Sequence, residues 1–142
     1  MNKIKDTSLN IARVLIVIGF IIGLKSWWQT ISHINDESYT LIPEFTKGKY
    51  HAWYHAFREA IGDLSVMTII LILFFGKKSW RTPITWWISF ILLIGYYAPF
   101  WIGTPFVPQL AAPHLTAELV HLGMAIPPFI GLLIAKKYFN IK

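Results

Sequence analysis

The sequence predicts an all-α integral membrane protein, a four-helix bundle whose N- and C-termini both lie in the cytoplasm. Composition is the first indication: of 142 residues, 55% are hydrophobic and 14% charged, with a mean hydropathy of +0.51. The second is that the apolar residues gather in long runs. The third is that basic residues cluster beside these runs, as they do where they set orientation in a membrane. We therefore expect a multi-pass protein of the cell membrane, and specifically of a bacterial inner membrane.

The apolar runs predict helices at about residues 9–32, 50–76, 83–102 and 114–135. A hydrocarbon core of about 30 Å needs roughly 20 helical residues, so each run is long enough to span it. Thr82 and Pro83 suit the start of the third helix, because threonine caps helices and proline is tolerated at the first helical position. Pro113 can open the fourth helix. Residues 1–142 are thus expected to form a single transmembrane domain.

The basic residues determine the expected orientation. They occur in three segments: Lys3, Lys5 and Arg13, then Lys77, Lys78 and Arg81, and finally Lys136, Lys137 and Lys142. All three segments are expected on the cytoplasmic side, which leaves the loops 33–49 and 103–113 outside. The net charge of +6 then reflects orientation, and nucleic acid is not expected as a partner. The chain has no cysteine, which excludes disulfides and thiolate metal ligands.

Two ladders of ionisable residues fall in the outer half of the predicted bundle. Both follow helical spacing: His51, His55, Glu59 and Asp63 on the second helix, and His114, Glu118 and His121 on the fourth. Arg58 lies close to the His51 face. Such residues are costly in a bilayer, so they should point into the bundle. We expect the two ladders to lie side by side and to form one buried site near the outer face.

Metal binding is one explanation of this site. Imidazole nitrogen with carboxylate oxygen suits a divalent ion of zinc, iron, manganese or copper. The candidate ligands are His51, His55, His114, His121 and Glu118. The spacing from Glu118 to His121 also resembles the Glu-x-x-His element of di-metal bundles, although it occurs once. Haem held between His55 and His121 is a minor alternative, because it would leave most of the other polar residues unexplained.

Acid–base chemistry without a metal is the second explanation. The candidate catalytic residues are Glu59, Asp63, Arg58 and Glu118. A buried carboxyl group with a histidine as its proton partner could serve an isomerase or a quinone-linked oxidoreductase acting on a lipid-soluble substrate. The third explanation is structural: Arg58 would pair with Glu118 or Glu59, Lys25 would pair with another carboxylate, and the histidines would bond across helices.

We therefore predict a membrane-embedded enzyme with a His/carboxylate site that opens to the outer face and acts on a small or lipid-soluble substrate. The alternative is a non-catalytic accessory subunit or small transporter, in which the same residues form structural pairs or an ion path. Membrane lipid is the expected surrounding partner. A bundle of this size often associates, so a homo-oligomer is compatible with the sequence.

The first helix resembles the start of small four-helix membrane proteins of the DoxX-like class. The resemblance rests on Ile11, Ala12 and Arg13, followed by an apolar run with Gly19 and Gly23 and then Lys25. Chain length and the number of spans agree. Some members of that class are linked to quinone or sulfur redox chemistry, and the resemblance implies no particular functional residue in this chain.

Overall fold

The chain is helical throughout most of the residues that the computed structural model describes, 3–40, 48 and 50–140, and none of these lies in a strand. The long helices are α1 (Lys3–Ser32), α2 (His51–Phe75), α3 (Pro83–Tyr97) and α5 (Leu115–Ala135). The short elements are α4 (Pro99–Gly103) and the 3-10 turns η1 (Lys78–Trp80), η2 (Pro108–Leu110) and η3 (Lys136–Tyr138). The predicted all-α class is confirmed.

The single helix predicted for residues 83–102 is divided in the structure. α3 ends at Tyr97, and the short α4 begins at Pro99. Proline has no N–H to continue the ladder, and its ring crowds the carbonyl of the preceding turn. The other predicted ranges agree closely with α2 and α5, whereas α1 begins at Lys3, earlier than residue 9.

The start of α3 is fixed by the residues that predicted it. The Thr82 hydroxyl accepts a hydrogen bond from the Thr85 amide at 3.3 Å, and the Thr85 hydroxyl accepts one from the Thr82 amide at 2.9 Å. This reciprocal pair satisfies two amide donors that a helix start would otherwise leave unpaired, and Pro83 needs no donor at the first position. The α2–α3 connection therefore ends sharply.

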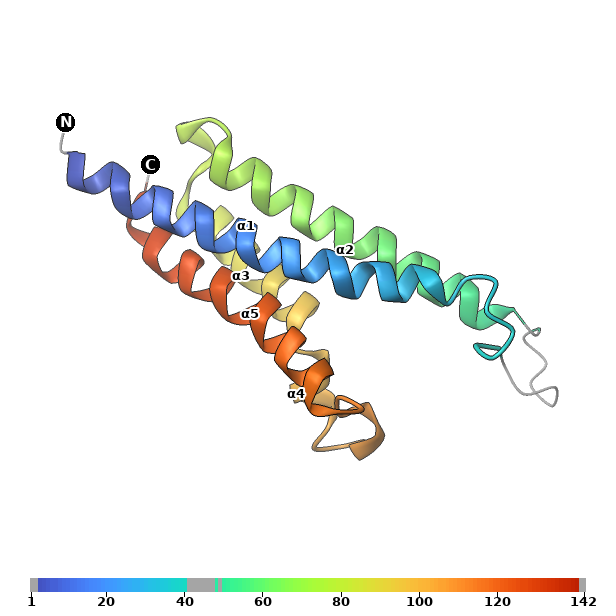
Figure 1. Ribbon diagram of the computed structural model, residues 1–142. Helices are drawn as coiled ribbons and strands as arrows, with labels where there is room; N and C mark the ends of the chain where they lie inside the picture. Colours follow the sequence, from blue (N-terminus) through green and yellow to red (C-terminus); the bar gives the residue numbers. More distant parts are fainter. Residues whose placement is uncertain (1–2, 41–47, 49, 141–142) are drawn as a thin grey trace.

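Helix α1 lies between α2 and α5, with α3 behind it (Figure 1). It packs against both α2 and α5, and α3 packs against the same two helices. Among the described residues, α2 and α5 make no extensive contact with each other. The expectation that the ladders of the second and fourth helices lie side by side was wrong, because α1 separates them.

Small residues allow α1 and α5 to approach closely. A Cβ atom placed on Gly19 would overlap the ring of Pro128, and one placed on Gly131 would lie 2.7 Å from the Ala12 carbonyl oxygen. Pro128 also lacks the N–H that would bond the Met124 carbonyl, and that carbonyl faces Gly19. The helix continues through Pro127 and Pro128 with α1 packed directly on the proline ring.

The buried residues recur at helical spacing on the sides of the long helices that face one another. The fully buried side chains include Ile16 of α1, Ile70 and Phe74 of α2, Leu93 of α3 and Leu132 of α5. Within a bilayer such contacts stabilise the bundle through close packing of the side chains. The four long helices thus share one apolar centre.

Both chain termini lie at the same end of the molecule, together with the α2–α3 connection (Figure 1). We call this the basic end: the start of α1, residues 76–82 and the end of α5. Here Arg13 donates from Nε to the Phe74 carbonyl at 2.9 Å, and the Lys136 ammonium lies 5.0 Å from the centre of the Trp86 ring. Burial, together with the nearby Arg13, lowers the pKa of Arg81.

Two helical stretches are long and apolar enough to cross a membrane, by length and composition: Thr7–Ser32 and Leu115–Tyr138. The first half of α2 carries Arg58, Glu59 and Asp63, and α3 has only 15 residues. Large aliphatic side chains are nevertheless exposed on all four long helices, for example Ile21 (63%), Ile72 (50%), Ile91 (65%) and Leu133 (59%). Such a continuous apolar exterior is unusual for a soluble monomer.

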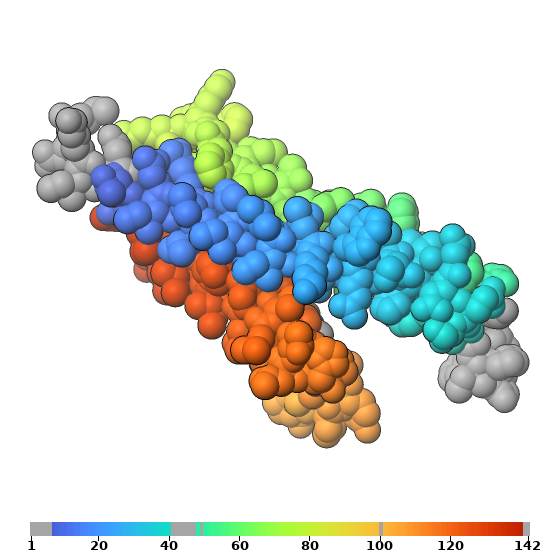
Figure 2. Space-filling model, viewed as in Figure 1, coloured from blue at the N-terminus to red at the C-terminus, as the bar shows by residue number. Residues whose placement is uncertain are grey.

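The helices separate at the opposite end, which we call the open end: the end of α1, the start of α2, residues 98–114 and the start of α5. Figure 2 shows the end of α1 and the start of α5 as two diverging arms with a gap between them. The candidate site lies between these arms.

Candidate functional site

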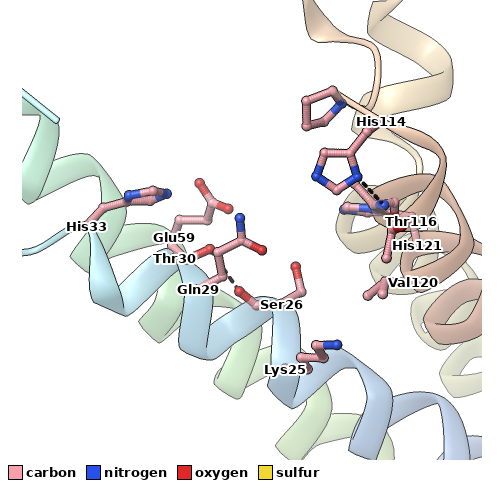
Figure 3. Close-up of a pocket in the computed structure, with 12 residues that line it drawn as sticks. Lys25, Ser26, Gln29, Thr30, His33, Glu59, His114, Thr116, Val120 and His121 are labelled. Atoms are coloured by element: carbon pink, nitrogen blue, oxygen red, sulfur yellow. Dashed lines mark hydrogen bonds between the residues drawn. The ribbon is translucent and has the colours of Figure 1, made fainter. Parts of the chain in front are cut away.

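A polar cleft of about 380 Å³ lies between α1 and α5 at the open end, with one residue of α2 at its wall (Figure 3). It is lined by Lys25, Ser26, Gln29, Thr30, His33, Glu59, Pro113, His114, Thr116, Ala117, Val120 and His121. Three of the five histidines of the chain take part. Of the predicted site residues, Glu59, His114 and His121 line this cleft, together with a wall from α1.

The wall from α1 was not predicted. Ser26, Gln29, Thr30 and His33 recur every three or four residues, so they share one face of the helix. The polar spacing from Ser26 to His33 was the signal that could have identified a lining face.

Lys25 completes the α1 wall (Figure 3). The structural hypothesis expected it to pair with a carboxylate, but no acidic partner for its ammonium group is found among the described residues. A cation that lines a cleft without a paired carboxylate is suited to an anionic or strongly polar group of a ligand.

The two histidines of the α5 wall are held in different hydrogen-bonded states. His121 Nδ1 lies 2.7 Å from the Ala117 carbonyl oxygen, which can only accept, so this nitrogen carries the proton. In the neutral form of the ring the lone pair is then on Nε2. His114 is the N-cap of α5, and its Nδ1 accepts a hydrogen bond from the Ala117 amide at 3.1 Å. Its Nε2 is then the donor.

Glu59 is the only predicted catalytic residue that lines the cleft, and it does so from α2. In Figure 3 it stands beside Thr30 and Gln29, on the wall that faces His114 and His121. Both the carboxylate and the two histidines are thus presented to one cavity from opposite sides. This arrangement can exchange protons with a molecule held between the walls.

The other predicted catalytic residues lie elsewhere. Asp63 is half-buried, one turn further along α2, and does not line the cleft. The hydroxyl groups of Tyr96 and Tyr97 are buried and find no hydrogen-bond partner among the described residues.

Arg58 and Glu118 do not form the predicted ion pair. The guanidinium of Arg58 lies over the Tyr54 ring, 5.9 Å from its centre. One carboxylate oxygen of Glu118 accepts a hydrogen bond from the Trp101 indole at 2.9 Å. The structural pairing of Arg58 with Glu118 was therefore wrong, because the two side chains belong to helices that α1 separates.

The predicted metal ligands are not assembled into one site. Within the residues that the structure describes, no group of three or more His, Asp or Glu side chains could hold a metal ion. His51 and His55 form a pair on α2, with their Nε2 atoms 2.8 Å apart. His114 and His121 belong to the cleft, and Glu118 is bound to Trp101.

An ordered corner holds His33 at the mouth of the cleft. The ring of His33 stacks on Tyr39 with the ring centres 4.2 Å apart. Asp36 accepts hydrogen bonds from the Ser38 hydroxyl at 2.6 Å and the Ser38 amide at 2.9 Å, which lower the pKa of Asp36. The Trp53 indole donates to the Asp36 carbonyl at 3.1 Å and ties the corner to α2.

Comparison with protein-family models, with curated proteins and with solved structures found no match to this chain. The resemblance of the first helix to the DoxX-like class stays a prediction, and the function of the site has to be inferred from its own geometry.

Proposed function

We propose that the chain is an integral membrane protein with four spans and both termini in the cytoplasm. Two helices of sufficient length and the aliphatic exterior of all four long helices support this. The position of both termini at the basic end supports the orientation (Figure 1). Cytoplasmic ends of spans carry the excess of lysine and arginine. The open end then faces outward.

We further propose that the protein is an enzyme that moves protons on a small or lipid-soluble substrate bound in the cleft. The observation that carries this is the placement of Glu59 and His121 on opposite walls of one cavity. The lone pair of His121 Nε2 can accept a proton, and Glu59 is the carboxyl partner. Lys25 and His114 Nε2 supply donors that would orient a polar group of the substrate.

The size and position of the cleft support this substrate class. Small-molecule sites commonly occupy about 300–1,000 Å³, and the cleft lies within this range. Because α1 and α5 diverge at the open end, a molecule dissolved in the outer leaflet has a lateral route between them (Figure 2). A metal is not required for this chemistry.

Solvent-deuterium incorporation tests the proposal, and it works even though the substrate is unidentified. Purified protein is reconstituted with a total lipid extract in D₂O, and extracted molecules are searched by mass spectrometry for deuterium bound to carbon. We expect the wild-type protein to introduce deuterium into at least one component. The double variant with Glu59→Gln and His121→Asn should introduce none. Glu37→Gln, which changes an exposed acid outside the cleft, is the matched control. Equal labelling by all three proteins, or none by any, would contradict the proposal.

A proton path is the second candidate, and the position of Asp63 favours it. Asp63 follows Glu59 by one turn on α2 and is half-buried, and the hydroxyls of Tyr96 and Tyr97 on α3 are buried without a hydrogen-bond partner among the described residues. Liposomes loaded with a pH-sensitive dye measure proton flux directly. If the protein is a proton path, the wild type and Glu37→Gln should conduct protons and Asp63→Asn should not. An enzyme without a proton path should give no flux in any of the three.

A further inference from the structure

His51 and His55 form a pair of imidazoles that the cleft does not use. They stand one turn apart at the start of α2, and their Nε2 atoms are 2.8 Å apart. The ring centres are 4.5 Å apart and the planes cross at 87°. Two ring nitrogens at this distance are aimed at a common point, which either a shared proton or a metal ion can occupy.

The spacing of the two nitrogens is close to what chelation of one ion needs. With metal–nitrogen bonds of about 2.0–2.1 Å, a 90° angle at the metal requires the nitrogens to be about 2.9 Å apart, and a tetrahedral angle about 3.3–3.4 Å. The two imidazoles are joined by a hydrogen bond of 2.8 Å, and a small side-chain adjustment gives either spacing. The choice of metal therefore rests on ligand chemistry: imidazole nitrogens bind Cu(II) more tightly than Ni(II) or Zn(II).

We propose that His51 and His55 form a two-histidine binding site for Cu(II), with the remaining positions of the metal filled by water. Copper is favoured over nickel by the general order of affinities of nitrogen sites for divalent metals. His55 is exposed and His51 half-buried, so an ion can reach the pair from solution. The nearest cation on the same helix face, Arg58, lies over the Tyr54 ring.

The site is independent of the proposed enzyme, because neither histidine lines the cleft. It also agrees with the finding that no described group of three His, Asp or Glu side chains could hold a metal. Two protein ligands and open positions describe a site that takes up an ion reversibly, unlike a closed structural centre.

Copper titration of the full chain in detergent tests the proposal, with electron paramagnetic resonance as the readout. We expect one Cu(II) per chain with a tetragonal spectrum split by two nitrogens, and binding in the order copper, nickel, zinc. His51→Gln and His55→Gln should each weaken binding more than about tenfold, since even indirect partners of metal ligands change affinity by 10–100-fold. His33→Gln and His121→Gln are matched controls from the cleft and should leave affinity unchanged.

A second measurement uses only the wild type, so it does not depend on the folding of variants. Diethyl pyrocarbonate modifies accessible histidines, and peptide mass spectrometry locates the modification. Copper should protect His51 and His55 and leave His33 and His114 reactive. Protection confined to the cleft histidines, unchanged affinity in His51→Gln, or zinc binding as tight as copper would each overturn the proposal.

Discussion

Four indole N–H groups bond to other parts of the protein among the described residues. Trp27 donates to the Ala60 carbonyl, Trp53 to the Asp36 carbonyl, Trp86 to the Leu132 carbonyl and Trp101 to the Glu118 carboxylate. Each of these bonds joins two different elements of the fold. An indole that reaches a backbone carbonyl in this way fixes the distance between two backbones.

The bond from Trp27 to α2 is the first prediction at this scale. Trp27→Phe keeps most of the ring but removes the donor that reaches Ala60 at 3.0 Å. The free energy of unfolding in detergent should fall by about 1 kcal/mol, the net value of a typical hydrogen bond. Trp28→Phe is the control, because its side chain is 67% exposed, and it should change stability little. Equal effects of both variants would contradict the role of the indole bond.

The corner at residues 33–40 should depend on pH through Asp36. Its two bonds from Ser38 stabilise the ionised carboxylate and lower its pKa. The stability that these bonds contribute is therefore complete above pH values near the pKa of an unfolded Asp, about 3.9. It is lost as the pH falls through the lower pKa that Asp36 has in the folded state. Hydrogen exchange should show the corner opening near that pH, and Asp36→Asn should abolish the transition. A corner whose protection stays constant as the pH is lowered through the acid range would count against this account.

At the scale of helices, sequence patterns predicted where each helix begins better than which helices pack against each other. The cap at Thr82 and the apolar period give α2, α3 and α5 nearly correct starts, because caps and periodicity act locally. The break at Pro99 was missed because the apolar run continues through it. Which helices touch depends on side-chain shapes from distant segments, and the ladders of α2 and α5 lie at the same end without sharing an interface.

The glycines illustrate the same limit. Gly62 and Gly95 lie within helices, yet a Cβ atom on either would meet nothing within 4 Å. The close approaches occur at Gly19 and Gly131. A glycine shows its packing role only when the surface opposite it is known.

The α1–α5 contact gives a prediction from a matched pair of variants. Gly19→Ala places a methyl group against the Pro128 ring and should destabilise the fold by about 1–3 kcal/mol, the usual cost of overpacking. Gly62→Ala meets open space, and alanine is a better helix former by about 1 kcal/mol, so stability should stay constant or rise. Thermal unfolding in detergent compares the two. Destabilisation by Gly62→Ala and not by Gly19→Ala would contradict the packing described.

For the whole molecule, the most useful observations from the sequence were its composition and the order of charged segments along the chain. The helical class is confirmed, and the charged segments expected on one side do lie at one end of the structure (Figure 1). The concentration of histidines predicted a site in the outer half of the bundle, where the cleft includes three of them, whereas its α1 wall became evident only from the fold. Glu59, His114 and His121 were candidates from sequence, whereas Gln29 and His33 became part of the site only through the packing of α1.

The central claim is that the cleft opens to the outer face of a membrane whose cytoplasmic side holds the basic end. The chain contains no cysteine, so a single introduced thiol reports its own position. Gln29→Cys places the thiol in the cleft, and Lys77→Cys places it on the exposed α2–α3 connection. In intact cells, a membrane-impermeant maleimide should label Gln29→Cys at once and Lys77→Cys only after permeabilisation. Labelling of Lys77→Cys alone in intact cells, or recovery of both variants outside the membrane fraction, would contradict the account.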